Sequence, residues 1–170
     1  MTEFIEHPFI SDLRSKYHLP KNEIEKGIEY DCRDGDIISL KIWGLHFDIN
    51  DFKELKILNE LRYLDLSGTH IKQIDGFEHF PKLEGLSLGD DHLGIGNEIS
   101  EITGLESLGK LRLLNLSFNK IKELKNLENL TLLDQLFITN NYISKIDGLE
   151  NLTNLEDNKK VGVDEKFGVN

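Results

Sequence analysis

Histidine is the residue type in this chain whose spacing most directly raises the question of metal chemistry. His46 and His70 occupy equivalent turn positions after two predicted strands, and His92 lies nearby. Adjacent strands of a sheet lie about 4.8 Å apart, which could bring the imidazoles together around zinc. The spacing matches no common zinc-binding pattern, so we predict no metal site.

Other reactive groups are isolated from one another. Cys32 is the single cysteine, the carboxylates are scattered over capping and surface positions, and the chain has no glycine-rich phosphate loop. Catalysis requires a nucleophile, base or metal held close to a second functional group. We therefore predict a protein that is not an enzyme and needs no cofactor, with a metal-dependent regulator or enzyme using the three histidines as the less favoured alternative.

Repeats are the elements that must position these residues. The pattern Leu-x-x-Leu-x-Leu begins at Leu61, Leu83, Leu111 and Leu133, and a further leucine follows at Leu155. These leucines are 22, 28, 22 and 22 residues apart. A fixed period near 22 residues indicates a solenoid of stacked units.

The repeated motif, Leu-x-x-Leu-x-Leu-x-x-Asn-x-Ile-x-x-Ile, resembles the leucine-rich repeat family. It is most similar to the 22-residue class found in bacterial internalins and in a eukaryotic protein-phosphatase regulator, and the resemblance covers residues 37–154. It implies an α/β fold, a right-handed solenoid with a short parallel sheet on the concave side and short helices on the convex side. It also implies that the concave face binds another protein.

Alternation within each strand predicts which side chains face the core. The inward residues are Leu64, Leu66, Leu86, Leu88, Leu114, Leu116, Leu136 and Ile138. Asparagine or threonine follows each strand, and we expect its side chain to bond the backbone of its own turn and of the next repeat. Thr103 with Glu106 typifies the capping boxes that predict the convex helices.

Large side chains at outward strand positions are the best candidates for contact with a partner, because exposed aromatic residues are enriched at interfaces. The candidates are Trp43, Tyr63, Leu113, Phe118 and Phe137. Two of them have alternative interpretations: Phe118 lies in the sequence Leu-Ser-Phe-Asn, which is ordinary for the family, and Trp43 could pack on the N-terminal cap.

The middle strand carries only small side chains at its outward positions. Gly85, Ser87 and Gly89 lie between strands that carry Tyr63 and Leu113, which predicts a notch with apolar walls, although the glycines could merely accommodate the longer repeat.

That repeat contains six extra residues at about 89–94. Its polar residues Asp90, Asp91 and His92 are further candidates for binding, with a functionless loop as the alternative.

The ends of the array need their own covers, because a solenoid with bare ends exposes its core. Residues 1–36 are predicted to form a cap from a helix beginning at Pro8 and a hairpin, residues 37–154 form about five repeats, and residues 155–170 form a tail. Either the tail folds back over the last repeat, or that edge is covered by another chain, which would allow self-association.

Charge narrows the class of partner. The 31 Asp and Glu residues exceed the 20 Lys and Arg residues, giving a net charge of -11. A negative field repels nucleic acid and anionic membrane surfaces and favours a basic or apolar protein surface. The single cysteine and the lack of a signal-like or membrane-spanning run predict a cytoplasmic protein. We therefore expect a protein-interaction module, with an acidic inhibitor of a basic enzyme as the alternative.

Overall fold

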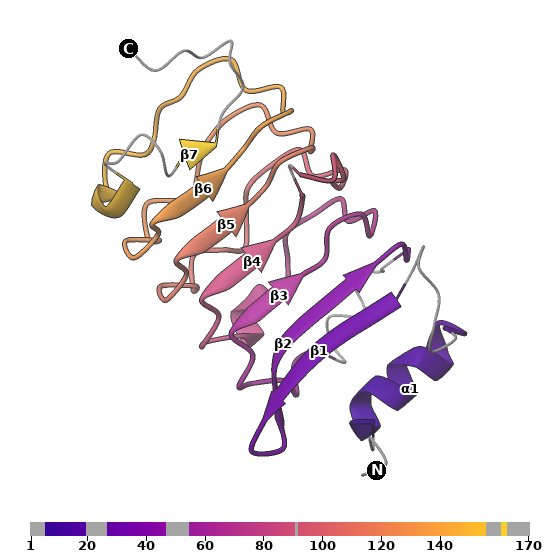
Figure 1. Cartoon of the computed structure of the whole chain (residues 1–170). Coiled ribbons are helices and arrows are strands. Elements are labelled where there is room, and N and C mark those ends of the chain that lie inside the picture. Colours follow the sequence, from indigo (N-terminus) through magenta and orange to yellow (C-terminus); the bar gives the residue numbers. More distant parts are fainter. Residues whose placement is uncertain (1–5, 20–26, 47–54, 91, 156–160, 163–170) are drawn as a thin grey trace.

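Seven strands form one sheet that runs the length of the molecule (Figure 1). The computed structural model describes residues 6–19, 27–46, 55–90, 92–155 and 161–162. In sheet order the strands are β1 (Gly27–Arg33), β2 (Asp36–Trp43), β3 (Tyr63–Asp65), β4 (Gly85–Ser87), β5 (Leu113–Asn115), β6 (Gln135–Phe137) and β7 (Val161–Gly162). All neighbours from β2 onward are parallel, as expected for a solenoid that adds one strand in each turn.

A helix and a hairpin begin the array. Helix α1 (Pro8–Lys16) follows His7, whose side chain accepts a hydrogen bond from the N–H of Phe9. The Arg14 guanidinium donates to the C=O of Ile28 at 3.0 Å and so ties α1 to β1. Strand β1 pairs antiparallel with β2, the first strand of the parallel stack.

The predicted inward residues are confirmed. All eight strand residues assigned to the core, from Leu64 to Ile138, are at most 2% exposed. Leu116, between two repeats, is fully buried. One face of the sheet therefore packs on a continuous leucine and isoleucine core, and the opposite face, called the strand face below, is open to solvent.

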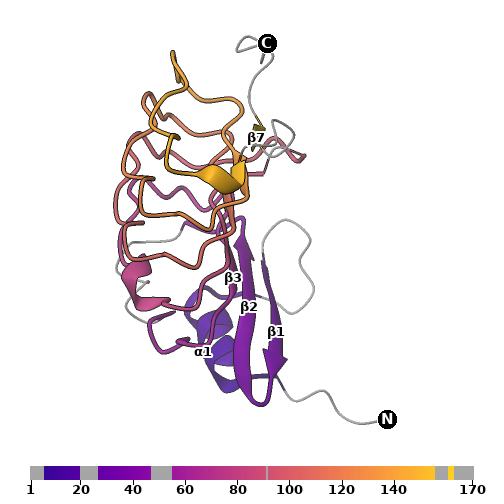
Figure 2. The same ribbon diagram turned by 90° about the vertical axis from the view of Figure 1, so that its left-hand side faces the viewer.

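The convex side is built from turns in place of the predicted helices. The described 3-10 helices are η2 (Phe77–His79) and η3 (Thr153–Leu155), each of three residues, and Figure 2 shows η2 on the side away from the strands. The Glu106 carboxylate accepts from the N–H of Gly104 at 3.3 Å, which is not the capping-box bond to Thr103. Between β3 and β4, and again between β5 and β6, the chain has 19 residues, and 3-10 turns occupy the convex part of each segment.

These turns follow one pattern in every repeat. The N–H of Leu108 bonds the C=O of Leu105, and the N–H of Leu111 then bonds the C=O of Leu108. The same two bonds, each spanning three residues, recur in the repeats that begin near 55, 77, 127 and 149. Consecutive 3-10 turns thus carry the chain to the next strand and bury one side chain in three.

Buried asparagines close the opposite turns. The side-chain oxygen of Asn97 accepts from the N–H groups of Thr69 (3.0 Å) and Ile71 (3.1 Å), and its amide donates to the carbonyls of Leu66 and Leu88 (both 2.9 Å). Asn97 is 7% exposed. Three of these four partners, Leu66, Thr69 and Ile71, belong to the turn of the preceding repeat. The prediction that the asparagine side chain would bond the next repeat was therefore wrong.

Asn119 and Asn141 repeat this arrangement. Their side-chain oxygens accept from the N–H groups of Ile99 (3.1 Å) and Ile121 (3.0 Å), each one repeat earlier. The hydroxyl of Thr69, at the start of the series, donates to the C=O of Leu66 in its own turn at 2.6 Å and lies 3.5 Å from the side-chain oxygen of Asn97 in the next repeat. The asparagines form a ladder that links four successive turns from 69 to 141.

At the C-terminal edge, strand β7 pairs parallel with β6 through Leu136 and Phe137 and so adds one more strand to the sheet. The predicted cap formed by residues 155–170 lies mostly outside the described residues. Self-association through this edge stays a prediction. Among the described residues, no helix combines the length and the apolar character needed to cross a membrane.

We predict that Asn119→Ala lowers the free energy of unfolding by about 2–4 kcal/mol, because it leaves buried N–H and C=O groups unpaired. Urea unfolding monitored by circular dichroism measures the change. The matched control is Asn129→Ala, an exposed convex position, which should change stability by less than about 0.5 kcal/mol. Equal losses in both variants would contradict the role of the ladder.

Candidate functional site

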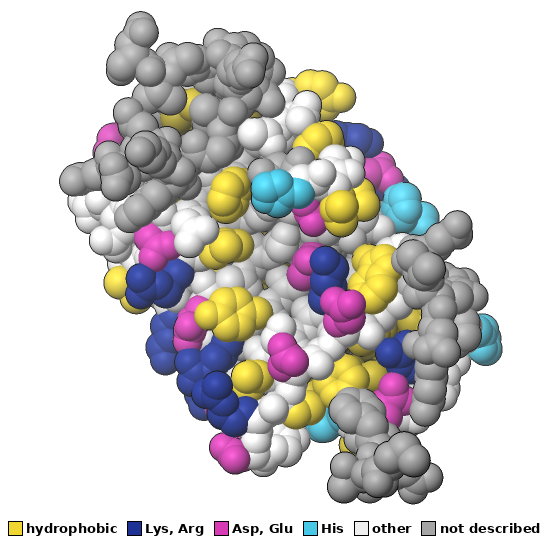
Figure 3. All heavy atoms as spheres, viewed as in Figure 1, with side chains coloured by type: hydrophobic (Ala, Val, Ile, Leu, Met, Phe, Trp, Pro, Cys, Tyr) yellow, Lys and Arg dark blue, Asp and Glu magenta, His cyan; other side chains and the backbone are white. Residues whose placement is uncertain are grey.

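Strand pairing arranges the side chains of the strand face in two rows, because directly opposed residues point to the same side of a sheet. The first row is Asp31, Ser39, Tyr63, Gly85, Leu113 and Gln135. The second row is Glu29, Lys41, Asp65, Ser87, Asn115 and Phe137. Seen from the strand side, hydrophobic and charged side chains alternate over the strands (Figure 3).

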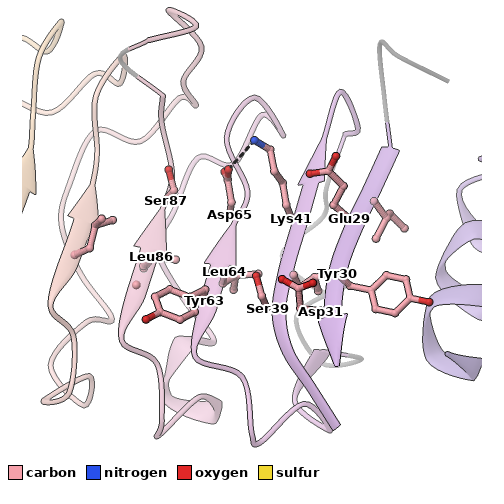
Figure 4. A pocket seen from close by; sticks show the side chains of 14 residues that line it. Glu29, Tyr30, Asp31, Ser39, Lys41, Tyr63, Leu64, Asp65, Leu86 and Ser87 are labelled. Carbon is pink, nitrogen blue, oxygen red and sulfur yellow. Dashed lines mark ion pairs between the residues drawn. The ribbon is translucent and has the colours of Figure 1, made fainter. Parts of the chain in front are cut away.

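A groove of about 630 Å³ lies over β1 to β5. Its lining brings together four of the predicted residues, Tyr63, Gly85, Ser87 and Leu113. Figure 4 shows Tyr63 reaching from β3 toward β4, and a Cβ placed on Gly85 would lie 2.7 Å from the tyrosine ring. The predicted open notch at Gly85 is therefore filled by the ring of Tyr63, which remains 50% exposed.

Hydrogen bonds fix the polar part of this groove. The Lys41 ammonium lies 3.2 Å from the Asp65 carboxylate (Figure 4). Asp65 also accepts from the N–H and hydroxyl of Ser67, at 2.9 and 2.6 Å. The Ser87 hydroxyl donates to the C=O of Gly89 and lies 3.2 Å from the hydroxyl of Ser67. The charge at Asp65 is thus held in place before any partner arrives.

A second groove, of about 490 Å³, lies beside the first and shares Glu29 and Lys41 with it. Its apolar lining is Trp43, Leu93 and Ile95, and its remaining polar residues are Ser67 and Asp90. Trp43 lies across Gly27 of the paired strand, where a Cβ would come 2.8 Å from the indole ring. The ring therefore packs on the hairpin while one side of it lines the groove.

The inserted residues of the long repeat form a closed hairpin. Asp90 and Ile95 exchange backbone hydrogen bonds, at 2.6 and 3.1 Å. The Asp90 carboxylate accepts from the N–H groups of His92 (2.9 Å) and Leu93 (3.0 Å). Asp90 is thus a turn-capping residue that also lines the second groove, His92 is exposed, and Asp91 lies outside the described residues.

Glycines flank this hairpin where it meets the next repeat. A Cβ on Gly89 would lie 1.8 Å from the carbonyl oxygen of Ser117, and one on Gly96 would lie 1.6 Å from that of Phe118. Only glycine fits such an approach. The ring of Phe118 lies beside Gly94 of the hairpin, 3.6 Å from the place of a Cβ there. Phe118 thus supports the insertion and lines neither groove.

Two apolar residues of the insertion were missed by the sequence analysis. Leu93 is 65% exposed and Ile95 is 42% exposed, although both are large and hydrophobic. The signal that would have identified them is an apolar residue at the tip of an inserted loop, where no core is available. Phe137, by contrast, lies in the second row beyond Asn115 and lines neither groove.

His46 and His70, the two histidines at equivalent turns, are in contact. The rings of His46 and His70 stack with centroids 4.3 Å apart and planes 12° apart. Parallel rings direct their nitrogens side by side and not toward a common point. In the part of the chain that the structure describes, no group of three or more His, Cys, Asp or Glu residues could hold a metal ion.

Acidic side chains predominate in the two grooves. Glu29, Asp31, Asp65 and Asp90 contribute carboxylates, and Lys41 contributes the one ammonium group among the lining residues that the structure describes. Lys41 is paired with Asp65. The strand face therefore offers a negative surface with apolar recesses.

Known proteins resemble the chain in its repeats. A family model described as leucine rich repeats, in two copies, matches residues 109–151. No relative was found among curated proteins. The solved structure of the internalin inlF from Listeria monocytogenes is 27% identical and has a TM-score of 0.56, covering 66% of this chain and 31% of that one.

Two further structures share the fold at lower identity. Internalin C2 from Listeria monocytogenes is 22% identical, with a TM-score of 0.54 over 73% of this chain and 60% of that one. The leucine-rich ectodomain of the receptor kinase SOBIR1 from Arabidopsis thaliana is 22% identical, with a TM-score of 0.50 over 91% and 93% of the two chains. The chain thus spans about a third of the inlF structure and three fifths of the internalin C2 structure.

The lone cysteine provides a test of reactivity. Slight burial and the charges of Asp31 and Asp36 raise the pKa of the Cys32 thiol. Because the thiolate is the reactive form, we predict that Cys32 is alkylated by iodoacetamide more slowly at pH 7.5 than a free cysteine. Asp31→Asn with Asp36→Asn should lower the pKa and increase the rate. A rate above that of free cysteine would contradict the prediction.

Proposed function

Because the chain is a leucine-rich repeat protein, we propose that it is a non-enzymatic protein-interaction module that binds a partner protein on its strand face. The observation that carries the proposal is the pair of adjoining grooves, which combine exposed Tyr63 and half-buried Leu113 with fixed carboxylates. A side chain such as Tyr63 supplies a large contact area at low entropic cost, as residues that dominate binding energy do.

The charges favour a partner that is basic at the contact. The grooves contain four carboxylates and one lysine, and the whole chain has a net charge of -11. Nucleic acid and anionic membranes would be repelled by the same field. A cytoplasmic location, inferred from the single cysteine, stays part of the proposal.

The same excess of carboxylates supports the second candidate, an acidic inhibitor of a basic enzyme. The two candidates differ in their dependence on salt, because electrostatic steering accelerates association and is screened by ions. An inhibitor steered by charge should associate much more slowly as ionic strength rises. Binding dominated by Tyr63 and Leu113 should keep its association rate.

We predict that peptides selected by this protein from a random displayed library bind the strand face. Tyr63→Ala should weaken their binding by about 1–3 kcal/mol, because the exposed ring is removed from the centre of the groove. Titration calorimetry with one selected peptide measures the loss.

The matched control is Tyr142→Ala, since Tyr142 is also an exposed tyrosine, at 66%, but lines neither groove. This variant should bind like the unmodified protein. The proposal fails if Tyr142→Ala abolishes binding while Tyr63→Ala does not.

A further inference from the structure

We infer that Trp43 and the inserted hairpin form a specificity pocket, which accepts one large apolar side chain from a basic, extended segment of the partner protein. This inference rests on the proposed function, because it places the pocket on the same strand face and defines the chemistry of the segment that binds there.

The walls of the pocket come from two separate parts of the sequence. The indole of Trp43, at the end of β2, lines the pocket together with the side chains of Leu93 and Ile95 from the inserted hairpin. Neither Leu93 nor Ile95 reaches the core, in which 37 of the described hydrophobic residues are buried. Large apolar side chains that face each other across a recess are stabilised when a further apolar group removes them from water.

The pocket is formed before binding. The Asp90 carboxylate fixes the hairpin by accepting two backbone N–H groups, and the Ile95 side chain packs on Gly68, where a Cβ would come within 2.5 Å of it. Gly89 and Gly96 hold the base of the hairpin against the next repeat. A pre-formed recess loses less entropy on binding than a loop that must first become ordered.

Carboxylates in the lining of the pocket select for positive charge. Asp90 and Glu29 line the pocket, and Asp31 lines the adjoining groove. No described cation forms an ion pair with Glu29 or Asp31. Basic residues on both sides of an apolar anchor would meet these carboxylates, whereas acidic residues would be repelled.

The shape of the surface favours an extended segment over a compact one. The two grooves share Glu29 and Lys41, so they adjoin each other between the hairpin and Leu113. Neighbouring strands are about 4.8 Å apart, and an extended chain advances about 3.3 Å per residue, so a segment of a few residues spans β2 to β5.

Trp43 is the sole tryptophan of the chain and lines the pocket, so its fluorescence reports directly on the occupant. The test uses three tryptophan-free peptides of nine residues. The first has a central leucine flanked by lysine and arginine, the second has glycine in place of the leucine, and the third has glutamate in place of the basic residues.

We expect the first peptide to change the emission of Trp43 in a saturable way and to bind about tenfold more tightly than the second. The third should produce no change. Equal affinity for the leucine and glycine peptides would show general attraction to an acidic surface without a pocket. Tighter binding of the acidic peptide would overturn the basic occupant, and no saturable change with any peptide would overturn the pocket.

Matched variants locate the effect. Leu93→Ala with Ile95→Ala should weaken binding of the leucine peptide about tenfold and leave the glycine peptide unchanged. The control replaces Leu132 and Ile57, which are 46% and 63% exposed and lie away from both grooves, and should have no effect.

The inference and the proposed function fail in different ways. If library-selected peptides lose affinity in Tyr63→Ala but not in the Leu93 and Ile95 double variant, the strand face binds and the pocket does not. If neither change weakens binding, both are wrong.

Discussion

The buried asparagine ladder is the interaction on which the rest of the structure depends. Each strand ends in a sharp bend that would leave backbone N–H and C=O groups unpaired inside the protein. Asn97, Asn119 and Asn141 pair these groups and, at the same time, bond the bend of the preceding repeat. The ladder thus sets the alignment of successive strands, and with it the two rows of side chains on the strand face.

This alignment explains why the longest repeat keeps its place in the stack. Its extra residues close on themselves through the Asp90 and Ile95 backbone bonds, and Asn97 then resumes the ladder in register. The insertion therefore cannot shift β5 relative to β4. It projects beside the strand face, where Leu93 and Ile95 add an apolar wall that a regular repeat lacks. The insertion thus changes the surface of the protein and leaves the packing of the core unchanged.

Periodicity in the sequence predicted the features that depend on spacing alone. Leucines at a fixed period identify the buried side of each strand, because residues two apart in a strand point to the same face. Features that depend on neighbours across the sheet were not predictable. The direction of the Tyr63 ring decides whether it covers Gly85, and alternation along one strand does not reveal that direction. The geometry of the bend likewise decides that each ladder asparagine bonds the preceding repeat and not the next one. The helix-start motifs indicated longer helices than form: at Asp75–Glu78 only the three-residue 3-10 helix η2 follows, because consecutive 3-10 turns lead the chain to the next strand.

Chemical-shift mapping of the labelled protein with a library-selected peptide locates the bound segment without any substitution. We expect the shifts to cluster on the strand face and the inserted hairpin, at the Trp43 indole and the amides of Lys41, Tyr63, Ser87 and Leu93. The exposed convex positions Glu106 and Glu128 should stay unchanged. Shifts that cluster on those convex turns, with the strand face unaffected, would contradict binding on the strand face.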